Sequence, residues 1–123
     1  MSKKIGLRKR IGLELYRRIH QERVKTHELR TLFWECTLRC NVACRHCGSD
    51  CRVSSVHPDM PMEDFLRVID SIRPQVNPHR VLVIFTGGEA LVRPDIEQCG
   101  MELYQRGFSW GIVSNGLYLD RQR

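Results

Sequence analysis

The sequence lacks any apolar run approaching the roughly 20 residues that a membrane-spanning helix needs. It also lacks the apolar stretch of about 7–15 residues that follows the basic start of a signal peptide, although its own start, MSKKIGLRKR, is basic. Its 123 residues suffice for one ordinary domain with a single core. We therefore expect a cytoplasmic protein without a membrane span, in which thiols stay reduced and clustered cysteines more often bind metal than form disulfides.

Two familiar metal-binding patterns are also missing, although five of the six cysteines fall within residues 36–51, CTLRCNVACRHCGSDC. Only Cys44 and Cys47 have the C-x2-C spacing, so the paired knuckles of a zinc ribbon are absent. The bacterial ferredoxin run C-x2-C-x2-C-x3-C is not matched either. What is present is C-x3-C-x2-C, formed by Cys40 with these two cysteines. A disulfide framework, a zinc site and an iron–sulfur cluster are the alternatives that the segment raises.

Positive charge gathers at the N-terminus. Residues 1–30 hold ten Lys/Arg and three Asp/Glu, whereas residues 31–123 hold ten and eleven, which together give the net charge of +6. We therefore divide the chain into a basic N-terminal helical segment, 1–30, and a core, 31–123. A solvated helix face is the plain interpretation of this charge, and an anionic partner such as RNA or an acidic peptide is the alternative.

The basic segment is predicted to be helical over residues 9–27. Ile11, Leu15 and Ile19 recur every four positions among charged and polar residues. We expect this stripe to pack on the core, and a membrane surface is the other possible support for such a helix.

Short apolar strands alternate with amphipathic segments from residue 31 onward. Strands are predicted over 31–36, 81–85 and 108–113. The second, VLVIF, is unbroken apolar sequence, which is typical of a strand buried on both faces of a parallel sheet. The alternation predicts an α/β fold with a parallel sheet and right-handed crossovers.

Two helices are predicted between these strands, and a third starts in LYLDRQR at the chain end. The first begins at Pro61 and stops at Pro74, and the second begins at Pro94 and ends at Gly107. The predicted apolar faces are Phe65, Val68, Ile69 and Ile72 on the first helix, and Ile96, Cys99, Gly100 and Leu103 on the second.

Each predicted strand is followed by a segment suited to a ligand. These segments are the cysteine-rich stretch, GGE at 87–89 and SNG at 114–116. Ligands of parallel α/β sheets bind at the C-terminal ends of the strands. The three segments are therefore predicted to share one site.

The string TLRCNVACRHC, followed by TGGEAL and later by SNG, resembles the radical S-adenosylmethionine (radical SAM) enzymes. Their hallmark is C-x3-C-x2-C with an aromatic-type residue, here His46, before the last cysteine. The resemblance covers residues 31–116 and implies the N-terminal half of a partial (β/α)6 barrel. Six βα units need about 180 residues, and residues 31–123 supply three. We therefore expect an incomplete fragment that is inactive alone and has an unpaired sheet edge.

The resemblance implies that Cys40, Cys44 and Cys47 hold a [4Fe–4S] cluster, which leaves one iron without a protein ligand. That iron is expected to chelate the amino and carboxylate groups of S-adenosyl-L-methionine. One-electron reduction by a donor such as flavodoxin or ferredoxin would then yield a 5′-deoxyadenosyl radical, which abstracts a hydrogen atom from a substrate.

The GGE segment is expected to bind the same cofactor. Gly87 and Gly88 let backbone approach a ligand closely. By family analogy, Glu89 accepts hydrogen bonds from the amino group of S-adenosyl-L-methionine. Ala90 stands where the family pattern has proline, so the turn is expected to be less rigid.

For three further residues, the sequence allows either a role in cofactor binding or a simpler structural interpretation. His46 would pack near the adenine, or it is a partly exposed loop histidine. Ser114 and Asn115 resemble the family's Thr-Asn-Gly, whose side chains face the cofactor or substrate, or they form a plain Asn-Gly turn.

The other cysteines are expected outside the cluster. Cys36 and Cys99 are predicted to be small core residues. Cys51 either joins them or provides a second thiolate near the cluster.

The local sequence of segment 36–51 looks most like that of radical SAM family members that modify peptides or proteins, including a group associated with small lipoproteins. An RNA-modifying radical SAM enzyme and a non-catalytic cluster- or zinc-binding fragment are the alternatives.

Overall fold

A computed structural model describes residues 6–119 and has the predicted α/β organisation. Three parallel strands form one sheet in the order β1-β2-β3. No helix in the described part of the chain is long and apolar enough to cross a membrane. The elements are α1 (Leu7–Thr26), β1 (Thr31–Thr37), α2 (Met62–Ile72), β2 (Leu82–Gly87), α3 (Ile96–Gln105) and β3 (Ser109–Ile112), with 3-10 turns at Arg73–Gln75, Pro78–Arg80 and Ala90–Val92.

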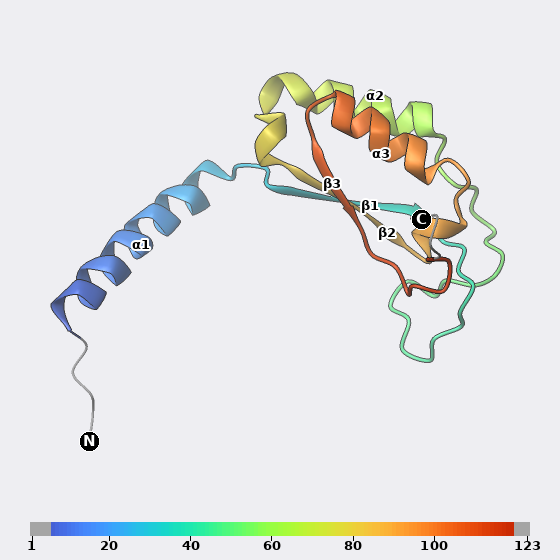
Figure 1. Ribbon diagram of the computed structural model, residues 1–123, viewed down its shortest axis with the longest axis horizontal. Helices are drawn as coiled ribbons and strands as arrows, with labels where there is room; N and C mark the ends of the chain where they lie inside the picture. The colour runs from blue at the N-terminus through green and yellow to red at the C-terminus, as the bar shows by residue number, and fades with distance from the viewer. Residues whose placement is uncertain (1–5, 120–123) are drawn as a thin grey trace.

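Helices α2 and α3 lie side by side over one face of the sheet, and the core lies between them and the strands (Figure 1). Trp34 of β1 stacks on Phe65 of α2, with ring centroids 3.7 Å apart. Phe85 of β2 meets the Trp34 ring edge-on at 5.6 Å. Aromatic pairs of this kind contribute about 0.5–1.5 kcal/mol beyond the area that they bury. The aromatic cluster therefore fixes α2 against the middle of the sheet.

The opposite face of the sheet carries no helix within residues 6–119. Phe33 on that face is 63% exposed, whereas Val83 and Phe85 on the helix side are fully buried. The prediction that strand 81–85 is buried on both faces was therefore wrong, because Leu82 of that run is exposed. The unbroken apolar run reflects one face packed on helices and a second face that is apolar but open.

The two core helices begin and end close to the predicted residues. Pro61 caps α2, and Gly107 ends α3 with a φ of 85°, a conformation that favours glycine. The four positions predicted for the apolar face of α3 are all buried. On α2 the buried residues are Phe65, Leu66 and Ile69, so the inclusion of Val68 was wrong.

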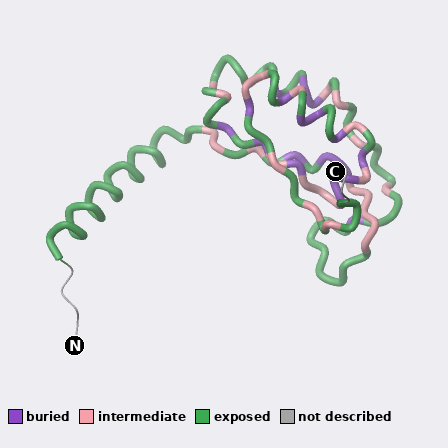
Figure 2. Tube along the Cα trace, viewed as in Figure 1, coloured by how far each residue is buried: buried purple, intermediate pink, exposed green. Residues whose placement is uncertain are grey.

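Helix α1 forms nearly where predicted but buries no residue. It extends away from the sheet and is exposed along its whole length (Figure 2). The expectation that the stripe of Ile11, Leu15 and Ile19 packs on the core was therefore wrong. Arg18 and Glu22 follow Ile11 and Leu15 at seven-residue spacing, so charged side chains share the face of the stripe.

The predicted helix at the chain end is not present over residues 117–119, which form a turn. The rest of that prediction, residues 120–123, lies outside the described residues.

Candidate functional site

The cysteine segment, the GGE turn and the SNG turn meet at the C-terminal edge of the sheet, as the strand order predicts. The backbone N–H of Gly88 donates to the carbonyl of Thr37 at 2.8 Å, and the N–H of Glu89 donates to the carbonyl of Arg39 at 3.0 Å. The N–H of Asn115 donates to Oε2 of Glu89 at 2.8 Å. Three strand ends are thus fastened to one another by direct bonds.

The two glycines of GGE are required by the closeness of the cysteine segment. Gly87 has a φ of 121°, and a Cβ atom there would lie 2.2 Å from the carbonyl oxygen of Thr37. A Cβ atom on Gly88 would lie 2.1 Å from the carbonyl oxygen of Arg39 and 3.2 Å from Cβ of Cys40. Any side chain at Gly88 would therefore push the cysteine segment away from β2.

Glu89 is completely buried beneath these turns. Its Oε1 accepts a hydrogen bond from the N–H of Leu91 at 3.0 Å, while Oε2 takes the bond from Asn115. Hydrogen bonds from backbone N–H groups to a carboxylate are charge-assisted and therefore strong. Glu89 thus ties the end of β2 to the turn that follows β3.

The cysteine segment is an irregular loop anchored at both of its ends. The N–H of Cys40 donates to the carbonyl of Arg52 at 2.7 Å, and the N–H of Arg52 donates to the carbonyl of Leu38 at 3.3 Å. Cys40 is half-buried beside this anchor, whereas Cys44 and Cys47 are exposed. All six cysteines are free thiols. Within residues 6–119 no three His, Cys, Asp or Glu side chains converge as metal ligands.

Cys47 and Cys51 lie in contact but in different surroundings. The N–H of Cys51 lies 3.4 Å from Sγ of Cys47, and this amide, together with that of Ser49, lowers the pKa of the Cys47 thiol. Cys51 is buried, and burial followed by the charge of Cys47 raises the pKa of its thiol to about 11. Cys47 is therefore the thiol of this pair that is ready to bind a metal.

Cys36 and Cys99 are core residues, as predicted. Both are buried, and burial raises the pKa of Cys36 to about 12 and that of Cys99 to about 11. The thiol of Cys36 donates to the carbonyl of Thr86 at 3.4 Å. Such thiols stay protonated and are poor metal ligands.

The SNG turn uses its own side chains to hold its shape. Ser114 Oγ accepts from the N–H of Gly116 at 3.0 Å, and Asn115 Oδ1 accepts from the N–H of Leu117 at 3.0 Å. These bonds form the turn that was one of the two interpretations of the sequence. His46 is an exposed loop residue beside the cysteines.

The sequence profile of the radical SAM superfamily matches residues 34–123, which include the whole of this edge. The chain belongs to the radical SAM superfamily.

Curated relatives lie within the same superfamily of enzymes. The chain is 27% identical over 89 residues to Fe-coproporphyrin III synthase of Methanosarcina barkeri, covering 72% of this chain and 22% of that protein. It is 31% identical over 67 residues to AdoMet-dependent heme synthase of Oleidesulfovibrio alaskensis, covering 54% and 16%. It is 39% identical over 80 residues to 7-carboxy-7-deazaguanine synthase of Rhodospirillum rubrum, covering 65% and 32%.

This radical SAM chain therefore spans less than a third of the length of the curated relatives that it matches. None of these three names denotes an enzyme that modifies a peptide or an RNA. No solved structure is a significant match.

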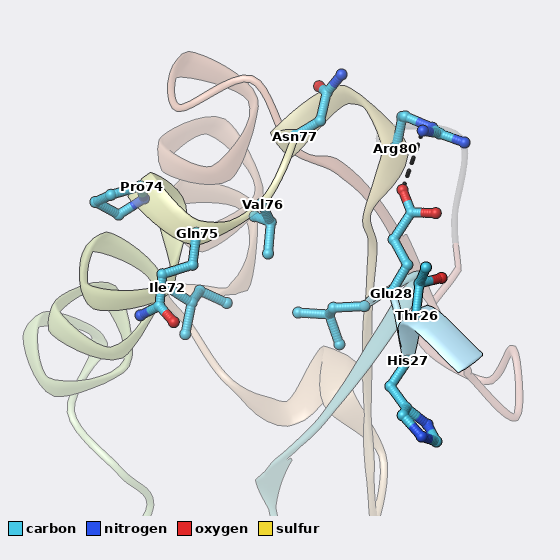
Figure 3. A pocket seen from close by; sticks show the side chains of 10 residues that line it. Thr26, His27, Glu28, Ile72, Pro74, Gln75, Val76, Asn77 and Arg80 are labelled. Carbon is cyan, nitrogen blue, oxygen red and sulfur yellow. Dashed lines mark ion pairs between the residues drawn. The ribbon is translucent and has the colours of Figure 1, made fainter. Parts of the chain in front are cut away.

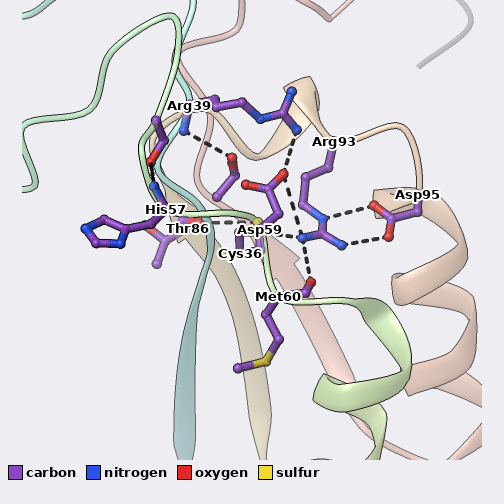
Figure 4. Close-up of polar contacts among 10 residues, drawn as sticks. Cys36, Arg39, His57, Asp59, Met60, Thr86, Arg93 and Asp95 are labelled. Atoms are coloured by element: carbon purple, nitrogen blue, oxygen red, sulfur yellow. Dashed lines mark hydrogen bonds and ion pairs between the residues drawn. The ribbon is translucent and has the colours of Figure 1, made fainter.

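One buried cation of the radical SAM chain was missed from the sequence. Arg93 is almost fully buried, and its Nη1 donates to the carbonyls of Cys36 at 2.8 Å and Met60 at 3.0 Å (Figure 4). Its Nε and Nη2 pair with the carboxylate of Asp95 at 2.9 and 2.6 Å. The guanidinium also lies 5.1 Å from the ring centroid of Trp34. Burial lowers the pKa of Arg93, but the hydrogen bond and charge of Asp95 lead the effects that together raise it above its usual value.

A second ion pair holds the far end of the cysteine loop. Arg39 Nη2 donates to Asp59 Oδ2 at 2.5 Å, and the Arg93 guanidinium lies 4.0 Å from the same oxygen (Figure 4). Burial raises the pKa of Asp59, but hydrogen bonds from Arg39 and Thr37 outweigh it and keep this pKa below its usual value. The sequence offers only Arg39 and Arg93, each near turn residues, as a signal for this network. Arginines in such places are too common to indicate a buried ion-pair network.

A hollow of about 720 Å³ lies at the opposite end of the sheet, where α1 leads into β1 (Figure 3). Glu28 and Arg80 form an ion pair of 3.1 Å on its wall. None of the predicted site residues lines it. Because ligands of parallel α/β sheets bind at the C-terminal strand ends, this hollow is not the candidate site.

Proposed function

We propose that this chain is part of a radical SAM enzyme in which Cys40, Cys44 and Cys47 hold a [4Fe–4S] cluster. One observation carries the proposal: the loop with these three accessible thiols is bonded to the GGE turn, through the N–H of Glu89 and the carbonyl of Arg39 at 3.0 Å. The match of the superfamily profile over this edge supports it further.

The donors suit an iron–sulfur cluster. Thiolates are the usual ligands of such clusters, and the three cysteines are free and outside the core. Because they do not converge within the described chain, binding must draw Cys44 and Cys47 toward the anchored Cys40. Metal binding then contributes to the folding of the loop, as in other small metal sites.

When bound, the cluster and S-adenosyl-L-methionine supply a one-electron cleavage that delivers a 5′-deoxyadenosyl radical for hydrogen abstraction. The chain's residues bind and orient the cofactor. We propose that the backbone of Gly87 and Gly88 forms the floor of its site, with Ser114 and Asn115 at one side. His46, exposed on the loop, is available to pack on the adenine.

Glu89 is the proposed acceptor for the amino group of S-adenosyl-L-methionine. Each carboxylate oxygen has a second lone pair beside the one used by a backbone N–H. Because the side chain is completely buried, the SNG turn must move aside slightly for this contact. Glu89 also has a role without the cofactor, since it holds the two turns together.

We further propose that the complete protein has the six-unit (β/α)6 barrel of the family. Three parallel strands with helices on one face support this, because further units would continue from β3 and cover the open face. A one-electron donor such as flavodoxin or ferredoxin and a cytoplasmic location are proposed with it, because free clustered thiols need reducing surroundings.

The proposed substrate is a peptide or protein that the enzyme modifies, which the local sequence of segment 36–51 supports. The names of the relatives, two of which make porphyrin products and one a deazaguanine, favour a small ring compound as a second candidate. RNA is the third, supported by seven Lys/Arg against two Glu on α1.

Anaerobic reconstitution with iron and sulfide tests the proposal. We expect iron and sulfide to be taken up by the wild-type chain, and S-adenosyl-L-methionine to perturb the electron paramagnetic resonance spectrum of the reduced cluster. A variant with Cys40, Cys44 and Cys47 all changed to Ala is the matched control and should take up neither.

The reconstituted protein also distinguishes an enzyme from a non-catalytic cluster- or zinc-binding fragment. Formation of 5′-deoxyadenosine under reducing conditions supports cleavage of the cofactor. Tight binding of zinc with no uptake of iron would contradict the cluster and leave the non-catalytic zinc-binding fragment.

A further inference from the structure

Asn115 is bonded through its backbone N–H and through both polar atoms of its side chain. Its backbone N–H donates to Glu89, and its Oδ1 accepts from the N–H of Leu117. Its Nδ2 donates to Oδ1 of Asn41 at 2.8 Å and lies 4.0 Å from Sγ of Cys40. The side chain therefore spans from the turn after β3 to the cysteine loop after β1.

The contact crosses the middle of the sheet. Asn41 and Asn115 are 74 positions apart in sequence. Strands β1 and β3 are not neighbours, because β2 lies between them. Asn115 Nδ2 therefore joins the outer two of the three motifs directly, by its bond to Asn41 and its contact with Cys40.

We propose that Asn41 and Asn115 are a positioning pair that fixes Cys40 as the anchored ligand, with Asn115 Nδ2 donating to the Cys40 sulfur. This inference rests on the proposed function, because it assigns Cys40 to the cluster. Asn115 thereby acts on a cluster thiolate, in addition to the cofactor or substrate side expected from the sequence.

Cys40 is already held on its other sides. Its N–H is bonded to the carbonyl of Arg52 at 2.7 Å, and Gly88 lies so near that a Cβ atom there would be 3.2 Å from Cβ of Cys40. Cys44 and Cys47 have exposed side chains. The pair adds one more contact to Cys40, which stays only half-buried, so this thiol keeps its place and its access while the others move in to bind.

An N–H donor at a cluster sulfur has an electrostatic consequence. It stabilises negative charge on the sulfur, and hydrogen bonds to cluster sulfurs are among the factors that set the reduction potential. Because the reduced cluster carries one more negative charge, the donor favours reduction. Loss of the Asn115 donor should therefore lower the potential.

The test compares variants with the wild-type chain. Asn115→Asp keeps an oxygen for the N–H of Leu117 but removes the donor, and Asn41→Ala removes the acceptor of the bridge. Asn77→Ala is the matched control, because Asn77 also accepts a backbone N–H bond but caps the turn at Pro78–Arg80.

The first measurement is made on the metal-free chain and does not depend on the cluster. Alkylation of each thiol by iodoacetamide is followed by peptide mass spectrometry. At about pH 10, where exposed thiols are ionised and accessibility sets the rate, we expect Cys40 to react at least about threefold faster in Asn115→Asp and Asn41→Ala, with Cys44 unchanged. Asn77→Ala should change neither rate.

The second measurement is the reduction potential of the reconstituted cluster, by titration followed with electron paramagnetic resonance. It should fall in Asn115→Asp, through the lost donor and the added carboxylate charge, and stay at the wild-type value in Asn77→Ala. A fall also in Asn115→Ala, which adds no charge, isolates the effect of the lost donor. Equal Cys40 rates in the wild type and both bridge variants would overturn the pair. A wild-type chain that takes up no iron would instead contradict the proposed function, and the alkylation rates would still decide the pair.

Discussion

The six cysteines lie in two kinds of surroundings, the packed layer between sheet and helices and the loop at the strand ends. Cys36 and Cys99 lie in the layer, where burial raises the pKa of their thiols to about 12 and about 11. On the loop, backbone N–H groups lower the pKa of Cys47. The comparison teaches that surroundings, rather than residue type, separate a thiol that packs from a thiol that binds.

Cys51 shows where the boundary between the two regions lies. It belongs to the loop in sequence and contacts Cys47, yet it is buried and its pKa is raised to about 11. It therefore behaves as a member of the packed layer. The two regions are held together by Arg93, which bonds the end of β1 to the residues before α2.

The largest effect should come from breaking the packed layer. Ile69→Ala on α2 removes a completely buried side chain and should lower the free energy of unfolding by about 2–5 kcal/mol. The matched change Ile19→Ala on α1, where the side chain is 45% exposed, should alter it by less than about 0.5 kcal/mol. Urea unfolding measures both. Equal losses would mean that α1 packs on the core.

A smaller effect should come from separating the loop from the sheet. Gly88→Ala places a Cβ atom 2.1 Å from the carbonyl oxygen of Arg39 and should cost about 1–3 kcal/mol of unfolding free energy. It should also reduce iron uptake, because the loop is displaced. Gly48→Ala, on the same loop with open space around the new atom, should change neither.

The smallest expected difference concerns the chemical reactivity of two neighbouring thiols and involves no change in stability. At about pH 8 and without metal, Cys47 should react with iodoacetamide at least about tenfold faster than Cys51, because it is exposed and has the lower pKa. Peptide mass spectrometry measures both rates in one sample. Equal rates would contradict the assignment of Cys51 to the packed layer.

Much of the fold could be predicted because local signals agreed with the global pattern. Pro61 and Gly107 punctuate α2 and α3, and the alternation of strand and helix predicted the parallel sheet. The predictions that failed concerned tertiary packing. Neither the exposure of α1 nor the open face of β2 can be derived from periodicity, which indicates a face but not whether anything covers it.

The site was predictable to a similar extent. The meeting of the three motifs followed from strand order, and the core positions of Cys36 and Cys99 followed from their strand and helix patterns. The roles of Arg93 and Asn41 were missed, because their partners lie far away in sequence. Cluster and cofactor binding by the named residues stay predictions.

The most direct test of the account is the iron content of six single Cys→Ala variants after anaerobic reconstitution, expressed per folded chain. We expect Cys40→Ala, Cys44→Ala and Cys47→Ala to lose most of the iron. Variants at the other three cysteines should keep it, and Cys99→Ala should instead lose stability, by about 0.5–3 kcal/mol. If Cys51→Ala loses as much iron as Cys44→Ala, the three-cysteine cluster is wrong.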